Sequence, residues 1–158
     1  CLKMCLDFTK PNEIPSIDNL IKEGELIGGY VDKIGWKHEA VVRLAHNYGV
    51  TAYPEEFRSI KVDINSKTFS ENILEKDLID RGIQRIRDSI DRKVAVIVST
   101  STKLGPHQVV VVGYEDNLGA TTGFFVNDPD NRNSEKKGVF VPISEFLNNW
   151  RKFAIFVG

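Results

Sequence analysis

Two stretches, His107-Gln-Val-Val-Val-Val-Gly-Tyr114 and Gly123-Phe-Phe-Val-Asn-Asp-Pro129, decide the fold of this chain. Runs of β-branched and aromatic residues bounded by glycine and proline are typical of strands. Because the two runs follow each other closely, we expect them to pair as an antiparallel hairpin with its turn near residues 117–119. The hairpin carries a histidine at the start of one strand and an aspartate at the end of the next.

The expected register places His107 and Asp128 on the same face of this hairpin. The numbers of opposite residues then sum to roughly 235–237, and an odd sum leaves the two side chains on one face, about one diagonal apart. A histidine at this position with no partner would more often have a structural role than a catalytic one. A neighbouring carboxylate changes this, because it can accept the Nδ1 hydrogen of the ring and fix its tautomer. The pair is then the base and its orienting acid in a site whose nucleophile is a thiol or hydroxyl.

The remaining pattern predicts helices in the first part of the chain and strands in the second, which is typical of an α+β domain. Helices are expected over 1–9, 16–22, 37–48, 73–91 and 144–151, and strands over 50–53, 94–99, 107–114, 123–127, 138–141 and 153–157, with an extended piece near 60–64 and a turn over 115–122. Gly24 is expected to end the second helix and Ser144 to cap the last one. Val109–Val112 is expected to be buried on both faces of the sheet.

Length and charge narrow the class of protein. The chain has 158 residues and a formal net charge of -1, which suits one domain over residues 1–158 and argues against nucleic acid as a partner. No apolar run approaches the roughly 18–20 residues needed to span a bilayer. The first helix begins at Cys1 with no cap residue before it, so we expect the domain to be truncated at its N-terminus.

The ordered motifs resemble a known family. The matching segments are His107–Asp116, Phe125–Pro129, Val141–Phe146 with Trp150, Gly35-Trp36 and Ile90–Lys93. Together they resemble bacterial papain-like cysteine peptidases related to the proteases that process double-glycine bacteriocin leaders. The resemblance implies an α+β papain-like fold, with N-terminal helices packed on a C-terminal antiparallel sheet and an active-site cleft between them. It also implies a secreted or cell-surface location.

The resemblance further implies hydrolysis of a peptide or amide bond by a Cys-His-Asp triad, without a metal or organic cofactor. His107 matches the family histidine and Asp128 the family aspartate. The family cysteine opens the first helix in the pattern Cys-Gly-Pro-x-x-Leu-x-Met. If Cys1 were that cysteine, Leu2 and Lys3 would replace Gly-Pro. If Cys1 is instead the second x, Leu2 and Met4 match, and the nucleophile lies four residues before Cys1.

Alternatives to this interpretation stay open at the level of sequence. The first is a papain-like binding module that lacks the nucleophile, and the second is an acyl or peptidyl transferase that uses the same machinery with an amine as acceptor. Cys5 is expected to be a small buried residue, and His38 and His46 to be surface or hydrogen-bonded structural residues. Gln108 and Asn127 point away from the pair by strand alternation and are interpreted as structural. Trp36 is expected to line the cleft and Trp150 to lie in the core.

Overall fold

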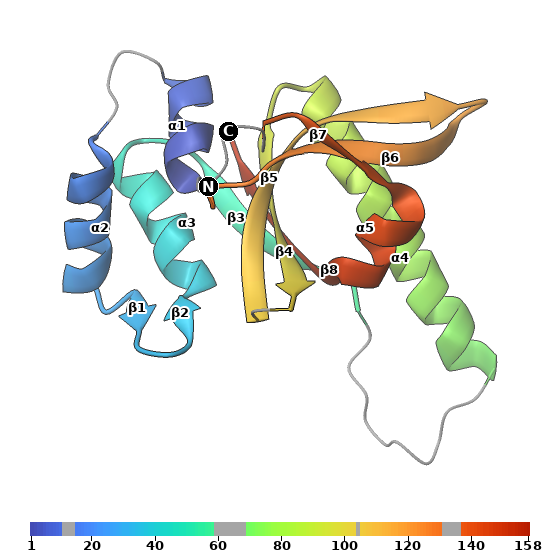
Figure 1. The fold of residues 1–158 in the computed structure, drawn as a ribbon, viewed down its shortest axis with the longest axis horizontal. Coiled ribbons are helices and arrows are strands. Elements are labelled where there is room, and N and C mark those ends of the chain that lie inside the picture. Colours follow the sequence, from blue (N-terminus) through green and yellow to red (C-terminus); the bar gives the residue numbers. More distant parts are fainter. Residues whose placement is uncertain (11–14, 59–68, 104, 131–136) are drawn as a thin grey trace.

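A computed structural model describes residues 1–10, 15–58, 69–103, 105–130 and 137–158 (Figure 1). Its centre is a six-stranded sheet, antiparallel throughout, in the order β3-β8-β4-β5-β6-β7. The strands are β3 (Ala52–Glu56), β4 (Ala95–Thr102), β5 (Gly105–Asn117), β6 (Ala120–Asn127), β7 (Val139–Pro142) and β8 (Trp150–Val157). A separate two-stranded hairpin consists of β1 (Tyr30–Val31) and β2 (Gly35–Trp36). The predicted α+β class is confirmed.

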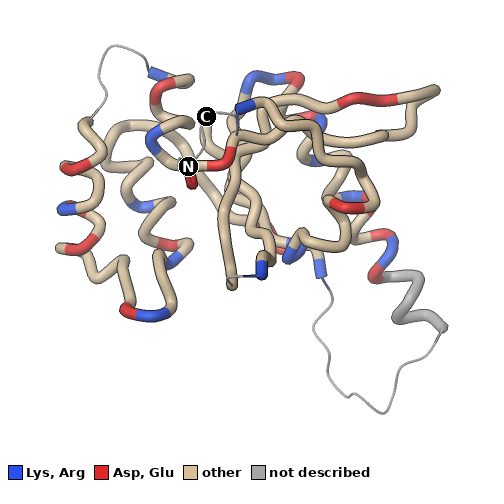
Figure 2. Tube along the Cα trace, viewed as in Figure 1, with Lys and Arg blue, Asp and Glu red and all other residues tan. Residues whose placement is uncertain are grey.

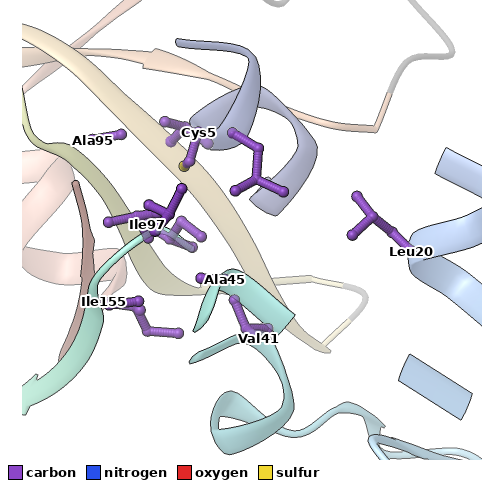
Figure 3. Packing of buried hydrophobic residues seen from close by; sticks show 12 residues of the cluster. Cys5, Leu20, Val41, Ala45, Ala95, Ile97 and Ile155 are labelled. Atoms are coloured by element: carbon purple, nitrogen blue, oxygen red, sulfur yellow. The ribbon is translucent and has the colours of Figure 1, made fainter. Parts of the chain in front are cut away.

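One face of the sheet is covered by α1 (Leu2–Thr9) and α3 (His38–Asn47), and α2 (Ile17–Leu26) packs against the outer side of α3 (Figure 1). Alternate residues of the strands point to this side, because successive side chains of a strand face opposite ways. Figure 3 shows how Cys5 of α1 and Ala45 of α3 pack toward Ile97 of β4 and Ile155 of β8. This first core includes the buried residues Cys5, Leu6, Leu20, Val41, Ala45, Val50, Ala52, Ala95, Ile97, Val110, Ile155 and Val157.

The opposite face is covered by α4 (Phe69–Asp91) and α5 (Ile143–Asn149). The chain therefore forms three layers, with helices on both faces of the sheet. Its apolar stripe faces the residues of β4 that alternate with the first core. This second core includes the buried residues Phe57, Ile86, Val96, Val98, Val109, Val111, Phe124, Val126, Phe146, Trp150, Ala154 and Phe156. Trp150 lies in the core as predicted, although it begins β8 instead of lying in the last helix.

Two predicted helix ends are wrong. Gly24 does not end α2, which continues to Leu26. A Cβ atom at residue 24 would lie 2.3 Å from Cζ3 of Trp36, so glycine is needed here for close packing against β2. Ser144 does not cap α5, because that helix already begins at Ile143, with Pro142 at the N-cap and no side-chain capping bond.

The β5–β6 hairpin also differs in detail from the expected one. Both strands run further than predicted and meet in a two-residue turn, where Leu118 and Gly119 have positive φ angles of 53° and 84°. A register shift between Val111 and Gly113 turns Val112 outward, leaving it 46% exposed, so the expected burial on both faces fails at this residue. The extended piece predicted near 60–64 lies outside the described residues.

Acidic and basic residues are interspersed over the elements of the chain (Figure 2). Arg87 of α4 shows one structural use of this charge, because it donates to Asp116 and to the Gly119 carbonyl and so ties the hairpin tip to the helix. Of the helices in the described ranges, none is long and apolar enough to cross a membrane.

Ile86 tests the packing of α4, because its side chain is fully buried against the sheet. Ile86→Ala should lower the free energy of unfolding by about 2–5 kcal/mol, since it removes buried methylene groups and leaves a cavity. The control is Asp80→Ala on the exposed side of the same helix, which should change stability by less than about 0.5 kcal/mol. Equal urea-unfolding midpoints for the two variants would contradict this packing.

Candidate active site

His107 and Asp128 meet where β5 and β6 separate. At this end of the hairpin the last paired residues are Val110 and Asn127, and their numbers sum to 237, an odd value within the predicted range. Two register shifts occur further along the hairpin, and they cancel, so the parity is preserved. His107 Nε2 lies 2.7 Å from Asp128 Oδ1. The predicted contact between the two side chains is therefore confirmed.

The nitrogen that makes this contact differs from the prediction, which had chosen Nδ1. Asp128 is reached by Nε2. An ionised carboxylate can only accept hydrogen bonds, so the hydrogen of a neutral ring in this pair sits on Nε2. Nδ1 is then the nitrogen with a lone pair, available to take a proton. Asp128 meets the far end of the ring because it follows the neighbouring strand, beyond the last paired residue.

The Asp128 carboxylate is held by a second donor. The backbone N–H of Asp130 donates to the same Oδ1 atom over 2.9 Å, which closes a local turn after β6. The side chains of His107 and Asp128 are 28% and 22% exposed. Partial burial strengthens a charge-assisted hydrogen bond, while the remaining exposure leaves the ring accessible to a substrate.

Helix α1 begins beside this pair. Cys1 is the N-cap of α1, and its Sγ atom donates to the backbone carbonyl of Gln108 over 3.3 Å. Cys5, one turn later, is fully buried, as predicted, and burial raises the pKa of its thiol to about 12. Cys5 is thus a protonated core residue at neutral pH, whereas Cys1 lines the same groove as His107.

The groove lies between the first helical layer and the start of β5 and has a volume of about 700 Å³. Its lining includes Cys1, Trp36, His38, Ser99, His107 and Gln108. Trp36 lines the groove, as expected from its place beside a glycine turn. Gln108 points away from the His107–Asp128 pair, as strand alternation requires, but into this groove. Asn127 is structural, because its Oδ1 accepts the Gly138 N–H over 2.7 Å.

The structure adds a polar pair to the groove that the sequence analysis did not assemble. His38 Nε2 lies 3.0 Å from the hydroxyl of Ser99, and the ring stacks on Phe153 with centroids 4.0 Å apart. His38 is thus hydrogen-bonded, as predicted, but it also faces the groove. A serine that interrupts the buried apolar run of β4 was the available signal. His46 is bonded to the backbone of Ala52 and does not line the groove.

Within the described residues, no group of three or more histidine, cysteine, aspartate or glutamate side chains is arranged to hold a metal ion. A thiol, an imidazole and a carboxylate placed around a groove are instead the groups that nucleophilic acyl chemistry uses. The described part of the site supplies the imidazole and the carboxylate.

The family model described as Peptidase_C39 like family matches residues 1–154. The chain belongs to this family. The family predicted from the motifs around His107 and Asp128 is thereby confirmed. No curated protein matches the chain.

Solved structures of similar peptidase domains support the papain-like fold of this family member. The peptidase domain of Streptococcus ComA, a bifunctional ABC transporter involved in quorum sensing, is 16% identical with a TM-score of 0.59, over 99% of this chain and 86% of that chain. A double glycine motif protease from an AMS/PCAT transporter, in complex with its leader peptide, is 15% identical with a TM-score of 0.59, over 99% of this chain and 82% of that chain. At these identities the likeness shows the fold alone.

His38 makes the stability of this Peptidase_C39 like domain depend on pH. Burial, and secondly the positive charge of Arg151, lower the pKa of His38 below its ordinary value of 6.5. The unfolded chain therefore binds the proton more readily than the folded chain. The stabilisation is complete above about pH 6.5 and is lost as the pH falls toward the lower folded-state pKa.

We expect the wild-type chain to lose stability relative to His38→Gln when the pH is lowered from 8 to 5. Glutamine can keep a hydrogen bond to Ser99 but has no proton to gain in this range. Urea-unfolding midpoints across the range measure the difference. Parallel pH profiles for the two proteins would show that His38 is not buried in its neutral form.

Proposed function

We propose that this domain hydrolyses a peptide bond through a cysteine thiol, with His107 as the general base and acid and Asp128 as the residue that orients it. The 2.7 Å contact between His107 Nε2 and Asp128 Oδ1 carries the proposal. It leaves Nδ1 as the proton acceptor at the edge of a groove that also contains the start of α1. A helix N-terminus stabilises a thiolate, and its free N–H groups can stabilise an oxyanion.

The direction of α1 supports a nucleophile one turn before Cys1. Cys5 lies in the core that contains Val110, and Cys1 is bonded to Gln108, so movement toward the start of the helix follows β5 toward its own start. One helical turn rises about 5.4 Å, which corresponds to between one and two strand residues of about 3.3 Å. A side chain four residues before Cys1 would thus lie level with His107. This agrees with the alignment in which Leu2 and Met4 match the family pattern.

The chemical steps balance without a cofactor. His107 Nδ1 takes the thiol proton, and the sulfur attacks the peptide carbonyl carbon to form a C–S bond. The C–N bond breaks as the imidazolium returns that proton to the leaving amine. Water then attacks the thioester and gives its proton to Nδ1. Hydrolysis releases a carboxylic acid, and the thiol regains its proton from the ring. Asp128 stabilises the imidazolium in both stages.

A peptide or protein segment is the substrate class that fits this groove. The groove volume of about 700 Å³ lies within the range that is typical of ligand-binding pockets. Apolar side chains such as Leu20 and Trp36 are combined with polar groups such as Ser99 along the lining. The related AMS/PCAT protease was solved with a leader peptide. We propose that this chain also acts on a peptide segment, which lies along the groove with its scissile bond beside His107.

His107 and Asp128 can be tested in the full-length parent protein. His107→Ala should abolish peptide hydrolysis. Asp128→Asn should lower kcat by roughly 10³–10⁴-fold, because an amide can donate to Nε2 and stabilise the wrong tautomer. Turnover of a fluorogenic peptide measures both effects, and urea midpoints show that the variants fold. His46→Gln is the matched control, since His46 lies outside the groove. Wild-type rates in either site variant would refute the assignment.

The identity of the nucleophile is a separate test. We expect the parent protein to carry a cysteine four residues before Cys1, and its substitution by alanine to abolish both hydrolysis and active-site alkylation by iodoacetamide. Cys1→Ala should keep activity within a few-fold. Loss of activity in Cys1→Ala alone would make Cys1 the nucleophile. If a residue without a thiol or hydroxyl stands at the upstream position and Cys1→Ala changes nothing, the domain is a binding module.

A further inference from the structure

A second hollow lies next to His107, apart from the groove. We call it the β7 pocket; it has a volume of about 260 Å³. Its apolar walls come from Val109, Val126, Val139, Val141 and Phe146, and Glu145 of α5 also lines it. The walls belong to β5, β6, β7 and α5, the elements of the second core. The pocket therefore opens on the part of the sheet away from α1.

His107 lines both hollows. Asp128 lines the β7 pocket, while the next residue, Pro129, lines the groove. The pair thus forms the partition between the two spaces. This arrangement is possible because β5 and β6 stop pairing at Val110 and Asn127, so the ring stands in the opening between the separated strands.

We propose that the β7 pocket binds the side chain of the first substrate residue on the amine side of the scissile bond. This inference rests on the proposed peptidase function and adds a specificity-determining site to it. The thiol reaches the carbonyl from the α1 side of the ring. The same ring gives its proton to the leaving amine, so that nitrogen lies against the imidazole. The residue that carries the amine then continues past the ring, where the β7 pocket lies.

The residues that line the β7 pocket determine which substrate side chain it accepts. A volume of about 260 Å³ is below the range of pockets for larger ligands, and it suits a single side chain. Valine and phenylalanine walls favour an aliphatic group, because its burial removes apolar surface from water. Glu145 and Asp128 contribute two carboxylates, and apart from His107 the described lining residues include no basic side chain. The pocket thus selects aliphatic residues and rejects acidic ones.

Three peptides that differ only at this position, with leucine, glycine or aspartate, test the inference on the full-length parent protein. We expect kcat/KM to be roughly 10–100-fold higher for leucine than for glycine, and lowest for aspartate. Val141→Trp fills the pocket and should remove the advantage of the leucine peptide over the glycine peptide. Val112→Trp is the matched control, because Val112 is exposed on β5 and lines neither hollow.

Glu145→Lys provides a second variant that does not disturb the core, because Glu145 is exposed. The added positive charge should raise kcat/KM for the aspartate peptide by about 10-fold or more relative to the leucine peptide. A specificity change of this kind would not follow from a merely structural role. If hydrolysis proceeds but both variants keep the wild-type order of the three peptides, the β7 pocket assignment is overturned and the peptidase function stands.

Binding of the amine-side product separates this inference from a failure of the peptidase function. A short peptide that begins with leucine should shift the backbone NMR signals of Val126 and Val139, which line the pocket, in the wild-type protein. The shifts should be absent in Val141→Trp and much weaker with a peptide that begins with aspartate. If no peptide is hydrolysed, these shifts still support the pocket, and their absence overturns it.

Discussion

The hydrogen bond between His107 and Asp128 depends on a boundary inside the sheet. His107 belongs to β5, where it pairs with Thr100 of β4, but it lies three residues beyond the last pair that β5 makes with β6. Asp128 directly follows the end of β6. The strands separate there, so the side chains face each other across an opening and are not packed against a covered surface. The hydrogen bond orients the imidazole ring, and the opening lets the ring line both the groove and the β7 pocket.

The three-layer architecture explains why the position of this boundary in the sheet is constrained. Buried residues of β4, such as Val96 and Ile97, alternate between two cores and hold the middle of the sheet from both faces. Each core would be strongly perturbed by a one-residue slip, because every side chain would move to the opposite face. The register of β4 and β5 is therefore strongly constrained. The point along β5 from which the His107 side chain projects is constrained with it. The hydrogen bond from Cys1 to the Gln108 carbonyl places the start of α1 next to the same point of β5.

Several features of the site were predictable because they depend on period and parity alone. The same-face placement of His107 and Asp128 needed only an odd register, and two bulges that cancel left it intact. The burial of Cys5 followed from a helical stripe, and the family followed from the order of its motifs. Other features were missed because they depend on distances between elements that are remote in sequence. The nitrogen that faces Asp128, the close approach of Trp36 to Gly24, and the pairing of His38 with Ser99 are of this kind.

The sequence by itself determined which residues alternate and roughly where most strands and helices occur. It also determined that a histidine at the start of one strand and an aspartate at the end of the next share one face. These are local properties, set by the period of the backbone and the side-chain types along it. Only the tertiary structure decided that α4 covers the second face, that Nε2 instead of Nδ1 meets the carboxylate, and that His107 stands between a groove and a pocket. Those outcomes depend on how separate elements pack, and packing is set by the shapes of surfaces that come together only in the folded chain.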